Sequence, residues 1–291
     1  MCGIVSEYLI PTSSSHPEGI AAGPDGALWF TEFFGNKIGR ITTTGSITET
    51  PAHSAPGEIA AGPDGALWFT EVSGDKIGRI TTGGTITETT IPTSGSGPQG
   101  IVAGPDGALW FTECMGNKIG RITTAGTITE KTIPTAGSHP VGIAAGPDGA
   151  LWFAECSGNK IGRVTTGGTF TETTIPTANS DPLGIAVGAD GALWFGEDHG
   201  NNIGRIGLGN AITETAVPTA AAEPEAIAAG PDGALWFTEF FGNKIGRITT
   251  GGTISETTVP TAGAELVWIA TGADGALWFT EFGANKIGRV Q

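Results

Sequence analysis

Hydrophobic and polar residues follow one short pattern that returns along the whole chain. In residues 98–134, short runs rich in Ile, Val, Thr, Trp and Phe alternate with Gly, Pro, Asn and Asp. Such runs, bounded by turn-forming residues, are typical of β-strands joined by tight turns. The pattern predicts four strands per copy, and we expect almost no helix because no stretch shows a 3.6-residue spacing.

One tryptophan marks each copy of the pattern. It falls at Trp29, Trp68, Trp110, Trp152, Trp194, Trp236 and Trp278, so the interval is 39 residues once and 42 residues five times. A four-stranded unit of about 40 residues is the blade of a β-propeller, and closing the blades into a ring protects the sheet edges. The sequence therefore predicts an all-β fold, a seven-bladed β-propeller of four-stranded blades.

The two ends of the chain together supply one blade. The last copy stops after its third strand, whereas residues 3–12 align without gaps with residues 84–93, a fourth strand. A solenoid would leave a lone strand at each end, so we expect residues 1–12 to be the outer strand of blade seven. The prediction is a single domain, 1–291, with blades at 13–52, 53–93, 94–135, 136–177, 178–219, 220–261 and 262–291.

Composition narrows the classes of function. The formal net charge of −15 argues against nucleic-acid binding, which needs a basic face. No apolar run reaches the length of a membrane span, and the three cysteines (Cys2, Cys114 and Cys156) have neither disulfide-framework nor metal-motif spacing. No signal peptide is recognisable, which favours the cytoplasm while leaving the compartment open. We expect a monomer.

Strand direction places the most variable positions on one mouth of the ring. The first strand of each copy starts where the second strand ends, so both points lie on the same face. The residues expected at this rim are His16, Glu18, Glu58, Gln99, His139, Asp181, Glu223, Glu225 and Glu265. Two interpretations stay open: drift of solvated loops, or an acidic pocket with Trp268 as an apolar wall and carboxylates placed for Mg²⁺ or Ca²⁺.

A glutamate ends the second strand of every copy, and its repetition indicates a structural role. A four-residue turn after it places Glu32 opposite Lys37 and Trp29 opposite Arg40. We therefore expect a Glu–Lys ion pair and a Trp–Arg stack in each blade. Blade five has Asn202 in place of the lysine.

The segments GPDGALWFTE, GNKIGRIT and GTITE, repeated around the ring with an N-terminal closing strand, resemble the streptogramin B lyases, the virginiamycin B lyase family. The resemblance covers essentially the whole chain. It implies a Mg²⁺-dependent lyase that confers antibiotic resistance by opening the lactone of cyclic depsipeptides. In that elimination a histidine removes a proton and the metal polarises the ester.

The site that this resemblance implies is only half present. The family's proton-abstracting histidine falls on Val267, its second histidine on Glu225 and its tyrosine on Glu18. Its metal-associated glutamates match Glu265 and Glu281, although every blade has a glutamate at the position of Glu281.

Three functions follow from this partial match. Because valine cannot accept a proton, we favour a lyase-like propeller that binds a small molecule, a cation or a protein at the central mouth. Its ligand-binding residues would be Glu18, Glu225, Glu265 and Trp268, with Mg²⁺ at Glu265 and Glu281. The alternative is a Mg²⁺-dependent lyase with a relocated base, for which Glu225 and His16 are the candidates. The third is a protein-binding scaffold with no small-molecule site.

Overall fold

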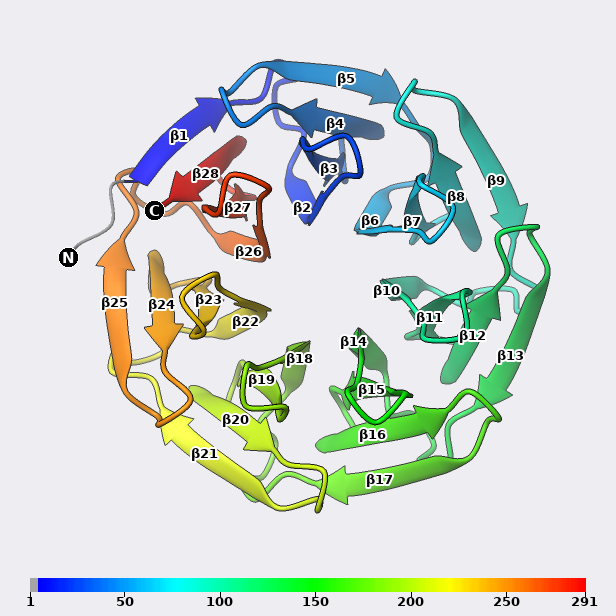
Figure 1. Cartoon of the computed structure of the whole chain (residues 1–291), viewed down its shortest axis with the longest axis vertical. Coiled ribbons are helices and arrows are strands. Elements are labelled where there is room, and N and C mark those ends of the chain that lie inside the picture. Colours follow the sequence, from blue (N-terminus) through cyan, green and yellow to red (C-terminus); the bar gives the residue numbers. More distant parts are fainter. Residues whose placement is uncertain (1–4) are drawn as a thin grey trace.

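The structure is a computed structural model that describes residues 5–291 and consists of seven antiparallel sheets arranged in a ring (Figure 1). Each sheet has four strands, and in the six sheets of consecutive strands the first is innermost and the last lies at the outer edge. The described residues contain no helix, and therefore none that could cross a membrane. The predicted seven-bladed β-propeller is confirmed.

Six sheets are each built from four consecutive strands. Blade one contains β2 (Pro17–Ala22), β3 (Leu28–Glu32), β4 (Lys37–Ile41) and β5 (Ile47–Pro51). Blade two contains β6 (Pro56–Ala61), β7 (Leu67–Glu71), β8 (Lys76–Ile80) and β9 (Ile86–Thr90). Blade three contains β10 (Pro98–Ala103), β11 (Leu109–Glu113), β12 (Lys118–Ile122) and β13 (Ile128–Thr132).

The next three blades repeat this order. Blade four contains β14 (Pro140–Ala145), β15 (Ala150–Glu155), β16 (Lys160–Thr165) and β17 (Phe170–Thr174). Blade five contains β18 (Pro182–Val187), β19 (Leu193–Glu197), β20 (Asn202–Ile206) and β21 (Ile212–Ala216). Blade six contains β22 (Pro224–Ala229), β23 (Leu235–Glu239), β24 (Lys244–Ile248) and β25 (Ile254–Thr258).

Blade seven combines the two ends of the chain, as predicted. Its inner strands are β26 (Leu266–Thr271), β27 (Leu277–Glu281) and β28 (Lys286–Val290), and its outer strand is β1 (Val5–Leu9). The pairing is antiparallel, with Val5 opposite Val290 and Leu9 opposite Lys286. Residues 1–4 of the expected closing strand, Cys2 among them, lie outside the described residues.

The hydrophobic core lies between neighbouring blades. Leu109 and Phe111 of blade three pack with Trp68 and Ile77 of blade two, and similar clusters fill the other junctions. The side chain of each repeated tryptophan also has a polar anchor in its own blade. The indole of Trp68 donates to Asp64 at 3.0 Å while the Arg79 guanidinium lies 5.8 Å from the ring centroid. The predicted Trp–Arg stack is thus confirmed, and it is seen in blades one, two, four, five, six and seven.

The predicted Glu–Lys ion pair is wrong, although the register behind it is right. Glu32 lies opposite Lys37, but the Lys37 ammonium pairs with Glu49 of the outer strand at 2.9 Å. Glu49 lies opposite Gly39. Because glycine has no side chain, nothing at that position separates the Glu49 carboxylate from the Lys37 ammonium. In this pairing the Lys37 ammonium remains partly exposed to water, and an ammonium group is strongly hydrated, so this position is favourable. Glu32 is left fully buried, and neither carboxyl oxygen has a hydrogen-bond partner.

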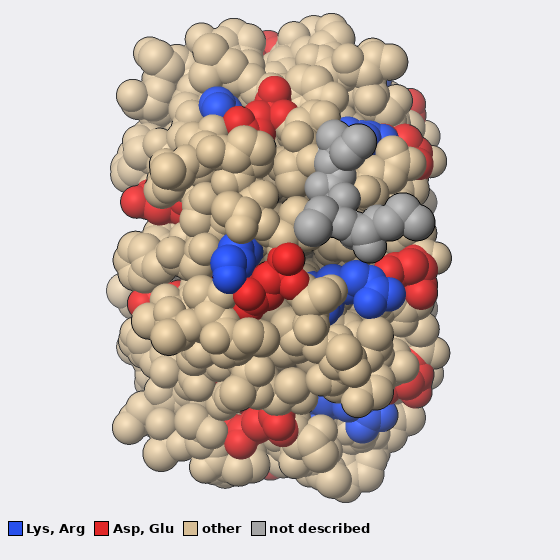
Figure 2. Space-filling view, turned by 90° about the vertical axis from the view of Figure 1, so that its left-hand side faces the viewer, with Lys and Arg blue, Asp and Glu red and all other residues tan. Residues whose placement is uncertain are grey.

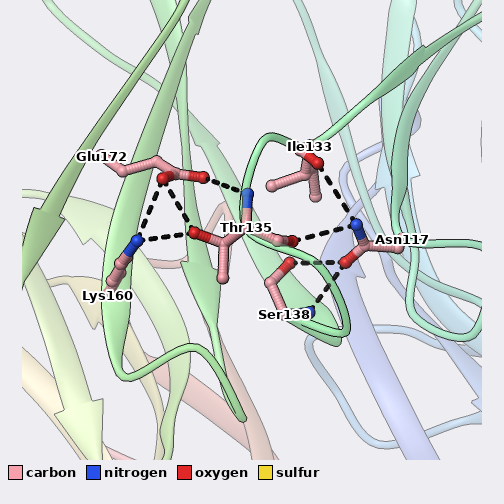
Figure 3. Close-up of polar contacts among 6 residues, drawn as sticks. All are labelled: Asn117, Ile133, Thr135, Ser138, Lys160 and Glu172. Atoms are coloured by element: carbon pink, nitrogen blue, oxygen red, sulfur yellow. Dashed lines mark hydrogen bonds and ion pairs between the residues drawn. The ribbon is translucent and has the colours of Figure 1, made fainter.

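The same lysine also fastens the connection between blades. In Figure 3 the Lys160 ammonium contacts Glu172 at 3.1 Å and donates to the Thr135 hydroxyl at 2.6 Å. Asn117 of blade three donates to the Thr135 carbonyl at 3.0 Å and accepts from the Ser138 amide at 2.8 Å. The segment that leaves blade three is therefore held between two blades. Basic and acidic atoms accordingly lie next to one another along the outer rim (Figure 2).

Candidate functional site: the central mouth

A β-bulge at the start of each innermost strand shapes the mouth. In blade three Pro98 pairs with Glu113 and the next pair is Ile101 with Phe111, so two residues oppose Thr112. The Thr112 hydroxyl accepts from the Gly100 amide at 2.9 Å and donates to a carbonyl of blade four at 2.6 Å. The bulge therefore ties neighbouring blades together around the axis. It also places the second residue of most inner strands in the wall of a central cavity.

The cavity has a volume of 180 Å³ and combines carboxyl groups with apolar walls. Its side chains other than glycine belong to Glu18, Glu58, Gln99, Val141, Leu183, Glu225, Val267 and Trp268. Blade two carries Pro56-Gly57-Glu58 where blades one, three, four and five carry Pro-x-Gly, so its glutamate is shifted by one position along the strand. Glu58 and Trp268 occupy that same later position, and both also line an adjoining pocket. The predicted pocket residues Glu18, Glu225 and Trp268 therefore do meet.

A wider entrance of 320 Å³ lies above the cavity. Its apolar side chains are Phe33, Val72, Phe240, Val267 and Phe282, together with Glu18, Gln99 and Glu225. Three of these are phenylalanines at the position that follows the glutamate of the second strand. These three phenylalanines were not predicted as site residues from the sequence. The signal was present, because that position varies between copies while the glutamate before it does not.

The carboxyl groups of the cavity have no basic partner among residues 5–291. All seven arginines and six of the seven lysines pair with aspartate or glutamate of the blades, at the sheet edges. Burial raises the pKa of Glu18 to about 7. Burial, then the negative charges of Asp198 and Glu18, raises the pKa of Glu225 well above its ordinary value. The pKa of Glu58 is also raised by burial, although the Ile101 amide donates to its carboxylate at 2.9 Å.

The two residues predicted to hold a metal lie at one corner of blade seven, and Glu265 does not line the cavity. The Glu265 carbonyl accepts from the Phe282 amide at 3.0 Å, and its side chain lies against Gly283. Glu281 is fully buried, and both of its carboxyl oxygens lack a hydrogen-bond partner. Burial, then the charge of Glu7, raises its pKa to about 8. Carboxylate oxygens without partners suit a hard cation, but the equivalent glutamates of blades one, two, three, four and six also lack partners, so Glu281 is not distinguished as a Mg²⁺ ligand.

His16, the second candidate base, lies beside the mouth and not in the cavity wall. Its ring centroid is 4.6 Å from that of Phe282 and 5.0 Å from that of Phe34. Its Nδ1 atom is buried and has no hydrogen-bond partner. Its backbone has φ = 51°, a left-handed conformation shared by the equivalent residues of several blades. The ring therefore packs as an aromatic group between blades seven and one.

Comparisons with known proteins agree with the fold. The model of the Virginiamycin B lyase family matches residues 1–178 and 145–291. Virginiamycin B lyase of Bacillus licheniformis is 47% identical over 43 residues, which is 15% of this chain and 15% of that protein. A streptogramin B lyase structure has a TM-score of 0.95 at 41% identity and covers 99% of this chain and 97% of its own.

A second solved structure is equally similar. It is a catalytically inactive histidine-to-alanine variant of virginiamycin B lyase from Staphylococcus aureus with quinupristin. Its TM-score is 0.95 at 43% identity over 99% of both chains. With its propeller, closing strand and family match over the whole length, the chain belongs to the virginiamycin B lyase family.

Proposed function

We propose that the protein binds a small, positively charged and partly apolar molecule in the central cavity, without the proton-abstracting histidine of its relatives. The observation that carries this proposal is the set of carboxyl groups in the cavity. Glu18, Glu58 and Glu225 face one space, and no basic side chain among residues 5–291 compensates them. Burial raises the pKa of each of these groups, so a cation that enters the cavity would favour their ionised form and would be held by it where water is excluded.

The apolar side chains of the cavity wall and of the entrance support the inference that the ligand is partly apolar. Trp268 offers a ring face, on which an organic cation gains cation–π attraction. Phe33, Phe240 and Phe282 surround the entrance and would contact a hydrophobic body that remains outside the cavity. A concave site with apolar walls and a few polar groups is the usual form of a small-molecule site.

Val267 supports the part of the proposal that excludes proton abstraction by a histidine, because it stands where the family has that histidine. Its carbonyl accepts from the Thr238 hydroxyl at 2.9 Å, so the strand keeps its geometry while the side chain has no group that accepts a proton. The Staphylococcus aureus relative is called catalytically inactive as a histidine-to-alanine variant, and it is described with quinupristin. By analogy, a member of the family without that histidine would still hold a ligand.

A second candidate function is a Mg²⁺-dependent lyase in which Glu225 is the base. The raised pKa of Glu225 favours it, because a carboxylate with a higher pKa is a stronger proton acceptor. Glu265 and Glu281 would hold the metal, which when bound supplies Lewis-acid polarisation of an ester. In this elimination Glu225 would accept a C–H proton, the electron pair of that bond would form a C=C bond, and the lactone C–O bond would break to release a carboxylate. Trp268 would orient the apolar part of the substrate.

One experiment separates the two candidates. The protein is incubated with a streptogramin B antibiotic and Mg²⁺, and mass spectrometry is used to detect the linear product while calorimetry measures binding. We expect binding without product. The affinity for the probe benzyltrimethylammonium should fall at least about tenfold in the Glu18→Gln/Glu225→Gln variant, since two carboxyl groups that can attract the quaternary ammonium as carboxylates are lost. Linear product that disappears in Glu281→Gln or Glu225→Gln would instead support the lyase. No binding of either compound would favour a protein-binding scaffold.

A further inference from the structure

A second cluster of polar side chains lies at the junction of blades four and five, outside the central cavity. Asp181 precedes β18, Asp198 and His199 follow β19, and Cys156 of blade four follows β15. The Asp198 amide donates to the Asp181 carbonyl at 3.2 Å, which holds the β19–β20 turn against the start of β18. From the sequence, Asp181 was expected only at the rim of the mouth.

Asp181, Asp198 and His199 are close enough to share one ion, and Cys156 contacts Asp181. His199 Nδ1 lies 3.2 Å from an oxygen of Asp181, and His199 Nε2 lies 3.9 Å from an oxygen of Asp198. One ligand atom from each of the three residues lies within 4.8 Å of the others. The Cys156 thiol donates to the second oxygen of Asp181. The adjoining pocket of 280 Å³ is lined by Cys156, Asp181 and His199. Asp198 Oδ1 is buried and has no hydrogen-bond partner.

The other blades provide an internal comparison, because their backbones are nearly the same. At the junction of blades seven and one, the positions of Cys156, Asp181 and His199 are occupied by Phe282, His16 and Phe34. There they form an aromatic contact, with centroids 4.6 Å and 5.0 Å apart. The fold therefore does not require polar side chains at these positions. Only at the junction of blades four and five do all of them carry metal-ligating groups.

We propose that Asp181, Asp198, His199 and Cys156 bind a divalent transition metal, with Zn²⁺ as the ion that fits best. An imidazole nitrogen, a thiolate and carboxylate oxygens are all established zinc ligands, whereas a thiolate disfavours Mg²⁺ and Ca²⁺. On binding, the Cys156 thiol would release its proton to solvent and coordinate as the thiolate. No lysine or arginine of the described chain pairs with these carboxylates, so the metal would supply the missing positive charge.

The proposal is tested with the full chain after removal of metal by a chelator. The protein is titrated with Co²⁺, whose absorption reports thiolate ligation, and with Zn²⁺ in competition with a chromogenic chelator. We expect one Zn²⁺ per chain at this junction and a thiolate-to-cobalt charge-transfer band that Cys156→Ser abolishes. The Asp181→Asn/His199→Asn variant should lose at least about 100-fold in zinc affinity, since removal of outer-shell groups alone costs about 10–100-fold.

Matched variants guard against loss of folding and against binding elsewhere. His16→Asn changes the residue equivalent to Asp181 at the junction of blades seven and one, and should leave zinc affinity unchanged. Glu18→Gln/Glu225→Gln should also leave it unchanged, because the central cavity is separate. The proposal is overturned if the Asp181→Asn/His199→Asn variant binds Zn²⁺ as the wild type does. It is also overturned if Mg²⁺ binds at this junction in preference to Zn²⁺, or if the only interaction there is the His–Asp ion pair.

Discussion

The buried glutamate at the end of each second strand makes stability depend on pH. In blade three Glu113 is fully buried, and burial, followed by the charge of Glu130, raises its pKa to about 8. In the unfolded chain the carboxyl returns to its ordinary pKa of 4.5. Folding at neutral pH therefore requires a proton to be taken up at Glu113, and this lowers the free energy of unfolding.

The substitution Glu113→Gln keeps the shape of the side chain and removes the proton uptake. Each pKa unit corresponds to 1.36 kcal/mol, so the interval between pKa 4.5 and ~pH 7 amounts to about 3 kcal/mol. Because the folded pKa lies above the unfolded one, the wild type loses this contribution as pH rises from about 4.5 to about 8. We expect the variant to exceed the wild type in stability by about 3 kcal/mol at ~pH 7 and to equal it near ~pH 4.

Urea unfolding of both proteins between ~pH 4 and ~pH 8 measures the difference. Glu130→Gln is the matched control in the same blade. Burial raises the pKa of Glu130, but hydrogen bonds from Thr93 and Lys118 outweigh it and the net pKa is lowered. This variant should therefore lose stability at neutral pH and recover relative to the wild type in acid. A Glu113→Gln variant whose stability difference is the same at both ends of the pH range would refute the reasoning.

Three further predictions concern the scaffold. Replacing Thr238 by valine removes the bonds from its hydroxyl to Val267 and from the Ala226 amide, and should lower the free energy of unfolding by about 1–3 kcal/mol; no change in the urea midpoint would contradict the role of this link. Removing residues 1–10 leaves β28 as an open edge and should cause aggregation at a lower temperature, measured by light scattering; an unchanged onset would count against closure by β1. Lys160→Met removes the ammonium contacts with Glu172 and Thr135, while the direct hydrogen bonds between those two residues remain, and should destabilise the protein by about 1–3 kcal/mol, with less loss at high salt; an effect that does not depend on salt would argue for lost packing alone.

The ring could be predicted from the sequence because every copy encodes a whole blade. The strands, their turns and the closing role of residues 3–12 all depend on local spacing. The Glu–Lys pairing could not be predicted in the same way. Spacing shows which residues lie opposite each other, but Lys37 has Glu32 on one side and Glu49 on the other. The choice depends on how deep each carboxyl lies, which is a property of the packed ring.

The central cavity, too, could be predicted from the sequence only in part. The positions of Glu18, Glu225 and Trp268 near the axis follow from strand order. The depth of Glu58 depends on a one-residue shift in blade two, and its effect is visible only once the bulge is known. Cys156 and Asp181 belong to neighbouring blades. Their contact could not be predicted, because the sequence of one repeat does not determine the distance between adjacent blades.

The pairing of β1 with β28 has a consequence for the response to force. Val5 lies opposite Val290, so the two ends of the chain emerge at the same end of one antiparallel pair. Tension applied to the termini would separate the two strands one hydrogen bond at a time. In this geometry the force acts on the hydrogen bonds in sequence and not on all of them at once. Blade seven would therefore open at low force and would be the first blade to separate from the ring.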